Sequence, residues 1–235
     1  MLRFSIIVAF CLLATHCGAH KKIVKEVEPA DCAAAADVEL CRDFRDIRNL
    51  IDANTLVYYI SSGYFQDESF RKAMDFVKTD QFKSVSKQIA ESNAYQKLLQ
   101  RFSNAGINTD SIASIANIFD CLMLSMPKYG DVDYSDSIEM QSLVVPRSLQ
   151  DVATNLMNAI PRSDFRKLIN EKLRNNSEFA KFYRIVRSKS FKREVKKLFA
   201  TYQLKYPLSV LKRHHIDLVK LAKMANQIFE WGPSY

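Results

Sequence analysis

Glycine and proline are scarce in this sequence, whose 235 residues include only 5 glycines and 6 prolines. A β-sandwich or β-barrel of this length needs many tight turns, and such turns are built largely from these two residues. Hydrophobic residues make up 48% of the chain, a share that suits a globular core. The composition therefore favours an all-helical fold over a sheet.

Long hydrophobic runs are also missing, since a helix that spans a bilayer needs roughly 20 apolar residues. The apolar run from Phe4 to Ala14 is too short, follows Arg3 and precedes the small residues Gly18 and Ala19. This order is typical of a secretory signal peptide, which we expect over residues 1–19. A signal anchor is the alternative. We expect a secreted protein.

Cysteine is sparse as well. Beyond the expected signal peptide only Cys32, Cys41 and Cys121 remain, an odd number that allows at most one internal disulfide. Which two of them pair is left open by the sequence. Apolar packing, rather than a disulfide scaffold, must stabilise the fold. The Asn175-Asn176-Ser177 triplet is a possible glycosylation sequon.

Histidine is too rare for most catalytic or zinc chemistry. After residue 19 there are three, His20, His214 and His215, and the chain has neither a G-x-S-x-G nor an H-E-x-x-H motif. Adjacent side chains on a helix point about 100° apart, so His214 and His215 are poorly placed to share a metal. We expect them to have a surface or capping role. We expect no catalytic residue, metal site or cofactor.

An internal repeat is the main feature that the sequence does contain. A shift of 109 residues aligns residues 47–122 with 156–231 without gaps, and 14 of the 76 pairs are identical. Most of the identities fall at apolar positions, such as Phe70 with Phe179 and Val77 with Val186. Core positions repeat while surface positions differ. The chain therefore contains the same helical unit twice.

Capping residues divide the first unit into short helices. We predict helices over 37–53, 55–65, 68–78, 81–91, 94–104 and 109–124. The expected N-caps are Asn54, Asp67, Thr79 or Asp80, Asn93, and Asn108 or Asp110. The predicted organisation is an N-terminal segment (20–36), a first unit (37–124), an acidic linker (125–148) and a second unit (149–235). Helices this short are marginal alone, so each must bury an apolar stripe.

Positive charge is concentrated in the second half. From residue 146 onward there are 19 Lys plus Arg against 7 Asp plus Glu, and eight basic residues lie between Lys181 and Lys197. This run is either a solvated face or a site for an anionic partner, such as lipid headgroups, a fatty carboxylate or a glycan. We expect no nucleic acid partner for a secreted protein. Three lysines recur at the 109-residue shift and could meet a carboxylate at a cavity rim: Lys72 with Lys181, Lys83 with Lys192, and Lys87 with Lys196.

The arrangement of short capped helices resembles the insect-allergen-related repeat family, which includes cockroach gut allergens, insect midgut microvillar proteins and caterpillar nitrile-specifier proteins. In the first unit the resemblance is carried by Asp46, Ile47, Leu50, Ile51, residues 67–70, Phe76, Val77, residues 80–85, Leu98, Leu99, Phe102, Gly106, Ile107 and residues 119–124. In the second unit it is carried by Asp151, Leu156, Ile160, Pro161, Glu178, Phe179, Val186, Phe191, Leu208 and Ile216. His214-His215 in place of Ala105-Gly106, and the basic second unit, depart from the family pattern.

The resemblance implies a capsule of two tandem repeats, each of about five to six short helices, around a large apolar cavity that holds fatty acid or another apolar small molecule. It also implies secretion into the gut lumen or onto microvilli. Residues expected to line the cavity are Phe70, Val77, Phe82, Ile89, Leu99, Phe102, Ile115, Phe119, Phe179, Val186, Phe191, Leu198, Leu208, Leu211, Met224 and Ile228. The expected protein is non-enzymatic. The alternatives are a nitrile-specifier-like detoxification protein acting on plant compounds and a structural microvillar component without a ligand. The oligomeric state is left open.

Overall fold

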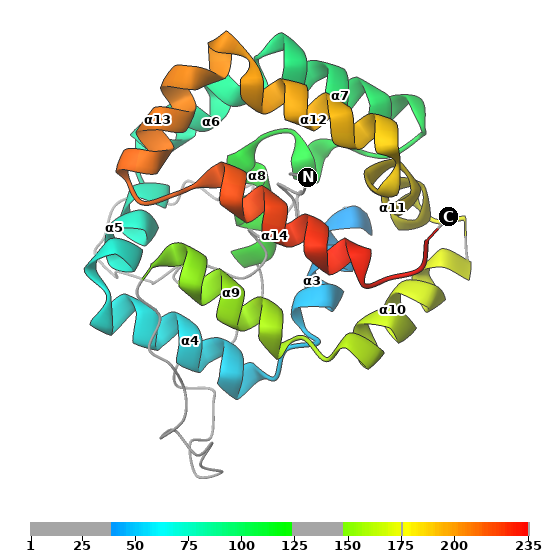
Figure 1. Ribbon diagram of the computed structural model, residues 1–235, viewed down its shortest axis with the longest axis horizontal. Helices are drawn as coiled ribbons and strands as arrows, with labels where there is room; N and C mark the ends of the chain where they lie inside the picture. Colours follow the sequence, from blue (N-terminus) through cyan, green and yellow to red (C-terminus); the bar gives the residue numbers. More distant parts are fainter. Residues whose placement is uncertain (1–38, 124–147, 175, 235) are drawn as a thin grey trace, which may run out of the picture.

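The computed structural model describes residues 39–123, 148–174 and 176–234, and all regular structure in these ranges is helical (Figure 1). The predicted all-helical fold is therefore confirmed. The expected signal peptide, the N-terminal segment, nearly all of the linker, Cys32 and Asn175 lie outside the described residues.

The described helices fall into two groups along the chain. The first contains α3 (Glu39–Arg48), α4 (Ala53–Gln66), α5 (Glu68–Val77), α6 (Asp80–Ala90), α7 (Asn93–Asn104), the 3-10 turn η2 (Asp110–Ile112) and α8 (Ile115–Met123). The second contains α9 (Leu149–Ala159), α10 (Arg162–Arg174), α11 (Glu178–Arg187), α12 (Lys189–Ala200), the 3-10 turn η4 (Tyr202–Leu204), α13 (Lys205–Arg213) and α14 (Leu218–Glu230).

Side-chain caps fix where most of these helices begin. Asp67 and Thr79 accept hydrogen bonds from the backbone amides of Phe70 and Phe82, as the sequence predicts. Three predicted caps are wrong, and one of them belongs to η2, whose N-cap residue is Thr109 in place of Asn108 or Asp110. Asp52 replaces Asn54 at the start of α4, and Ser92 replaces Asn93 at the start of α7. An oxygen on a short side chain caps a helix only when its residue lies just outside the first turn, and Asn54 and Asn93 lie inside it.

Two predicted helices differ in extent from those observed. The helix predicted over 37–53 ends at Arg48, because the following turn places Asp52 to cap the next helix. The helix predicted over 109–124 is divided into η2 and α8. The Ser114 hydroxyl accepts a hydrogen bond from the backbone amide of Asn117 at 3.1 Å and so starts a new helix within the predicted range.

Helix boundaries repeat at the same shift of 109 residues as the sequence. The starts of α4 and α10, Ala53 and Arg162, are separated by this distance, as are those of α6 and α12, Asp80 and Lys189. The counterpart of α7 is η4 followed by α13, and Pro207, which lacks an amide proton, lies in the first turn of α13. Helix α14 takes the place of both η2 and α8.

Several contacts between the two groups of helices are reciprocal. Helix α6 packs on α13 while its counterpart α12 packs on α7, the counterpart of α13. In the same way α3 packs on α11, and α9 packs on α5. Figure 1 shows the α6–α13 and α7–α12 pairs along one edge of the molecule, with α14 crossing in front of α8. This reciprocity is the pattern of a two-fold axis within one chain.

Candidate functional site

The predicted lining residues all belong to one apolar cluster that runs through both groups of helices. Twelve of the sixteen are buried, and Val77, Leu99, Leu208 and Met224 are half-buried and pack against the cluster. Eight of them lie on the amphipathic stripes of α5, α6, α11 and α12, and the other eight lie on α7, α8, α13 and α14. A cavity within this cluster stays a prediction.

One aromatic set lies within the first group of helices. The ring centroid of Phe82 in α6 lies 5.4 Å from that of Phe119 in α8 and 5.8 Å from that of Phe76 in α5. Both contacts are edge-on, the arrangement that suits the charge distribution of aromatic rings. Three helices therefore meet at one buried ring.

A second aromatic set joins the two groups of helices. The Phe102 ring in α7 lies 5.3 Å from Phe182 in α11, where the rings stack, and 5.1 Å from Phe191 in α12. Phe182 also contacts Phe44 in α3 at 5.4 Å and Phe229 in α14 at 6.0 Å. The apolar interior is consequently shared by both units.

Sequence reasoning missed several of these rings. Phe44, Phe182 and Phe229 were not among the predicted lining residues, although all three are fully buried. The counterparts of Phe44 and Phe182 at the 109-residue shift are Ala153 and Ala73. Comparison of the two units favours positions where both carry apolar residues of similar size, and it overlooks a large residue whose equivalent is alanine. These phenylalanines could have been predicted from their spacing along the helix, which places them on the same face as other predicted core residues.

A buried ion pair lies where α10 approaches α3. The Lys172 ammonium donates hydrogen bonds to Asp43 at 2.5 Å and Asp46 at 2.6 Å, and its side chain is only 14% exposed. Burial raises the pKa of Asp43, and the hydrogen bond and charge of Lys172 offset only part of that effect. Burial by itself lowers the pKa of Lys172, but the two carboxylates raise it overall.

A second polar connection lies where α7 meets α12. The Arg101 guanidinium donates hydrogen bonds to Glu194 at 2.9 Å and to Ser190 at 2.8 Å. It also lies 5.7 Å from the centroid of the Phe191 ring. At the 109-residue shift Arg101 corresponds to Val210 and Glu194 to Val85, and both valines are buried in the α6–α13 contact. The two reciprocal contacts therefore use different chemistry.

The two adjacent histidines end α13. His214 is the C-cap residue, and its ring stacks on Phe76 of α5 with centroids 3.7 Å apart and planes 3° apart. Burial, followed by the charges of Arg213 and His215, lowers the pKa of His214. His215 has φ of 61° and matches Gly106, whose φ is 72°. The predicted capping role is confirmed, and His214 additionally joins the two units.

The recurring lysines do not converge on one rim. Lys72 and Lys83 each pair with an acid on their own helix, and Lys87 pairs with the C-cap residue of its helix, Glu91; the side chains of the three lysines are 59% to 73% exposed. Lys192 instead reaches Glu230 of α14 at 3.1 Å, with its own side chain 15% exposed. Exposed pairs of the first kind contribute little to stability.

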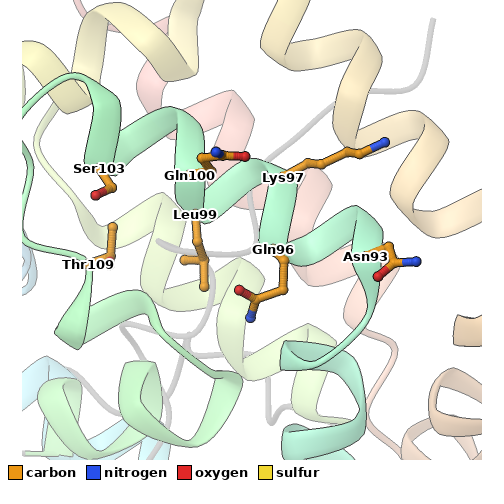
Figure 2. A pocket seen from close by; sticks show the side chains of 7 residues that line it. All are labelled: Asn93, Gln96, Lys97, Leu99, Gln100, Ser103 and Thr109. Carbon is orange, nitrogen blue, oxygen red and sulfur yellow. The ribbon is translucent and has the colours of Figure 1, made fainter.

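An open groove of about 580 Å³ runs along α7 (Figure 2). It is lined by Asn93, Gln96, Lys97, Leu99, Gln100, Ser103 and Thr109. All of these residues except Thr109 belong to α7. Most carry amides or hydroxyls, so the groove differs in chemistry from the apolar interior. The Gln96 amide group is already engaged, since it donates to the Ala90 carbonyl at 2.7 Å.

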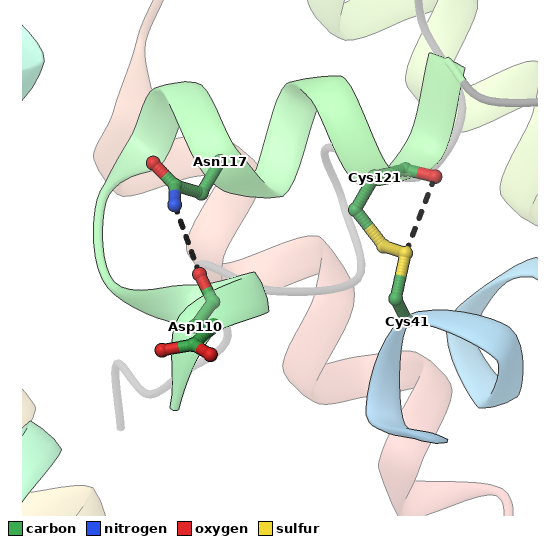
Figure 3. The surroundings of a disulfide bond; sticks show 4 residues. All are labelled: Cys41, Asp110, Asn117 and Cys121. Carbon is green, nitrogen blue, oxygen red and sulfur yellow. Dashed lines mark hydrogen bonds between the residues drawn. A yellow bond between two sulfur atoms is a disulfide. The ribbon is translucent and has the colours of Figure 1, made fainter. Parts of the chain in front are cut away.

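A disulfide connects Cys41 of α3 with Cys121 of α8, across a separation of 80 residues (Figure 3). The structure thus selects one of the pairings that the sequence left open. In the same region the side-chain amide of Asn117 donates a hydrogen bond to the backbone carbonyl of Asp110 at 2.9 Å, which connects α8 with η2. The residues equivalent to the two cysteines are Gln150 and Glu230, so the matching α9–α14 contact has no such link.

The described ranges also bear on metal binding and on membrane insertion. There, no group of three or more His, Cys, Asp or Glu side chains is arranged to hold a metal ion. Nor does any helix in those ranges combine the length and apolar character needed to cross a membrane.

Comparison with known proteins supports the resemblance noted in the sequence. Residues 39–222 match the family model described as insect allergen related repeat, nitrile-specifier detoxification. No significant match to this chain is found among curated proteins or among solved structures. The matched range begins with α3, ends within α14 and covers most of the chain. The protein therefore belongs to the insect allergen related repeat family.

Proposed function

We propose that this protein is a secreted, non-enzymatic carrier that binds a fatty acid or similar lipid within its apolar interior, in the gut lumen or at the microvillar surface. The observation that supports it best is the aromatic set centred on Phe102, which contacts Phe182 and Phe191 of the other unit. A guest in this interior would contact both units at once.

The physical basis of binding is the transfer of an alkyl chain out of water. Burial of each methylene contributes about 0.8 kcal/mol. The described cluster offers aliphatic and aromatic surface from nearly every helix, and the two charged side chains that are buried in the described ranges, Asp43 and Arg48, both belong to α3. Affinity should therefore grow with chain length until the interior is filled.

The direct test is mass spectrometry of an organic extract of the purified protein. We expect fatty acid or a related lipid in the extract. After delipidation, saturated fatty acids of increasing length should bind with a dissociation constant that falls about fourfold per added methylene. An extract without lipid, together with no saturable binding at any length, would overturn the proposal.

A matched pair of variants locates the binding. Phe102→Leu introduces the residue found at the equivalent position, Leu211, and shrinks the ring that contacts the second unit. We expect it to change the preferred chain length. Phe65→Ala removes an aromatic ring that is 72% exposed, and it should leave binding unchanged. Equal effects of both variants would indicate that lipid binds outside the interior.

Detoxification is the second candidate, because the family description names nitrile-specifier activity. Its test is the product mixture of enzymatic glucosinolate hydrolysis with and without the protein. A larger nitrile fraction in the presence of the protein would favour detoxification. Unchanged products, with no bound lipid, would leave the third reading, a structural component of the microvillus.

A further inference from the structure

The outer face of α12 carries an unbroken stripe of positive charge. Its exposed cations are Lys189, Arg193, Lys196 and Lys197. Their spacing of four, three and one residues places them on one side of the helix. The acidic residue of α12, Glu194, lies beside the stripe and is held by Arg101 of α7.

Further exposed cations lie on α13, which follows α12 along the same edge of the molecule (Figure 1). Lys205, Lys212 and Arg213 are exposed there. Two aromatic side chains stand among these cations, Tyr202 at 81% exposure and Tyr206 at 60%. The Lys205 ammonium lies 5.2 Å from the centroid of the Tyr202 ring. We call these seven cations and two tyrosines the basic face.

The charges of the basic face are not neutralised by the rest of the described chain. None of its seven cations forms a salt bridge with another described residue. Lys192, which is close to them in sequence, differs because it pairs with Glu230. Accumulated like charge on a folded surface is unfavourable unless a partner of opposite charge is available.

The first unit provides a matched comparison, because the same positions occur there at the 109-residue shift. The seven cations correspond to Asp80, Ser84, Lys87, Gln88, Gln96, Ser103 and Asn104. One acidic and one basic residue cancel, so this face has no net charge. Helix packing is common to both units and does not require the cations. The charge therefore has a role other than folding.

We propose that the basic face docks the protein on an anionic lipid surface. Cations near such a surface gain attraction from the negative headgroups, and the gain adds over several residues. Exposed tyrosines suit the same partner, since the ring is apolar and its hydroxyl tip stays hydrated at headgroup level. Docking does not depend on a guest in the interior, so it can hold or fail separately from lipid carriage.

The test exchanges five cations of the basic face for the residues of the first unit: Arg193→Ser, Lys197→Gln, Lys205→Gln, Lys212→Ser and Arg213→Asn. Co-sedimentation is measured with phosphatidylcholine vesicles that contain or lack phosphatidylglycerol. We expect the parent protein to bind only the anionic vesicles, and to release them at high salt. Binding of the variant should be weaker by more than about 100-fold.

A control variant replaces five exposed lysines outside the basic face by neutral residues, at Lys72, Lys87, Lys97, Lys167 and Lys220. It therefore has the same net charge as the first variant. It should retain most of the vesicle binding, and its circular dichroism should match that of the first variant. Equal loss in both variants would mean that net charge alone attracts the protein, which overturns the proposal. Retention on immobilised heparin without binding to anionic vesicles would also overturn it, in favour of a glycan partner. A Tyr202→Ser, Tyr206→Ser double variant should bind anionic vesicles more weakly than the parent at low salt.

Discussion

The ion pair between Lys172 and Asp43 occupies the same place in one unit as a close apolar contact in the other. A shift of 109 residues converts Lys172 and Asp43 into Gly63 and Val152. A β-carbon added at Gly63 would lie 2.9 Å from Cγ2 of Val152, so α4 and α9 approach closely there. Where α10 meets α3, the polar side chains of Lys172 and Asp43 fill the equivalent space.

Removing one partner of the ion pair should be more harmful than removing both. Lys172→Leu leaves the Asp43 carboxylate buried without its counter-ion, and we expect a loss of about 2 kcal/mol in the free energy of unfolding. The double variant Asp43→Val, Lys172→Leu should lose less than Lys172→Leu alone, because apolar packing replaces the pair. Urea denaturation of the two singles and the double measures the coupling. Strictly additive losses would contradict it.

Gly63 should tolerate no side chain. Gly63→Ala forces the new methyl group against Val152, and we expect a net loss of about 1–2 kcal/mol in spite of the better helix propensity of alanine. Shortening the opposing side chain with Val152→Ala should recover part of this loss. Thermal unfolding of both variants and their combination tests the contact. If the combination were no better than Gly63→Ala, another clash would be responsible.

The positive-φ positions at the ends of α7 and α13 predict opposite effects of exchanging their residues. His215 adopts φ of 61° at the position where the first unit has Gly106. His215→Gly should raise the free energy of unfolding by about 1 kcal/mol, because glycine reaches this region without steric cost. Gly106→Ala should lower it by about the same amount. A new β-carbon at Gly106 would meet only the Lys181 ammonium, at 3.5 Å, so backbone strain explains the loss.

His214 should make stability depend on mildly acidic pH. Its pKa in the folded protein is lowered from 6.5 by burial, Arg213 and His215, so the unfolded chain binds more protons as pH falls below 6.5. Stability should therefore decrease as pH falls from that value toward the folded pKa. His214→Ala, which installs the residue of the first unit, should flatten this part of the profile. Denaturant midpoints measured between neutral and acidic pH provide the test. His215→Gln should flatten the profile only in part, because it removes one of the three causes that lower the pKa of His214.

The sequence predicts the helices better than the contacts between them. The 109-residue shift, together with caps such as Asp67 and Thr79, places most helices within a few residues. Asp52 and Ser92 were missed because neighbouring asparagines are equally good caps in isolation, and only the path of the chain chooses between them.

The differences between the units were the least predictable feature. Comparison of the two units identifies matched residues such as Phe70 and Phe179. Where the units differ, as at Phe44 and its equivalent Ala153 or at Lys172 and its equivalent Gly63, the reason for each residue becomes clear only from the residue that it contacts. Such partners are distant in sequence: Asp43 and Lys172 are separated by 129 positions. Tertiary packing, and not local pattern, decides which residue each site accepts.

The reciprocal contacts of α6 with α13 and of α12 with α7 have a consequence for the origin of the chain. A polypeptide of half this length would expose the faces of two helices that here are covered by the other half. Two copies of it could cover each other by the same exchange, forming a symmetric homodimer. Gene duplication and fusion would then turn that dimer into a single polypeptide, whose halves could acquire different charges while keeping a common scaffold.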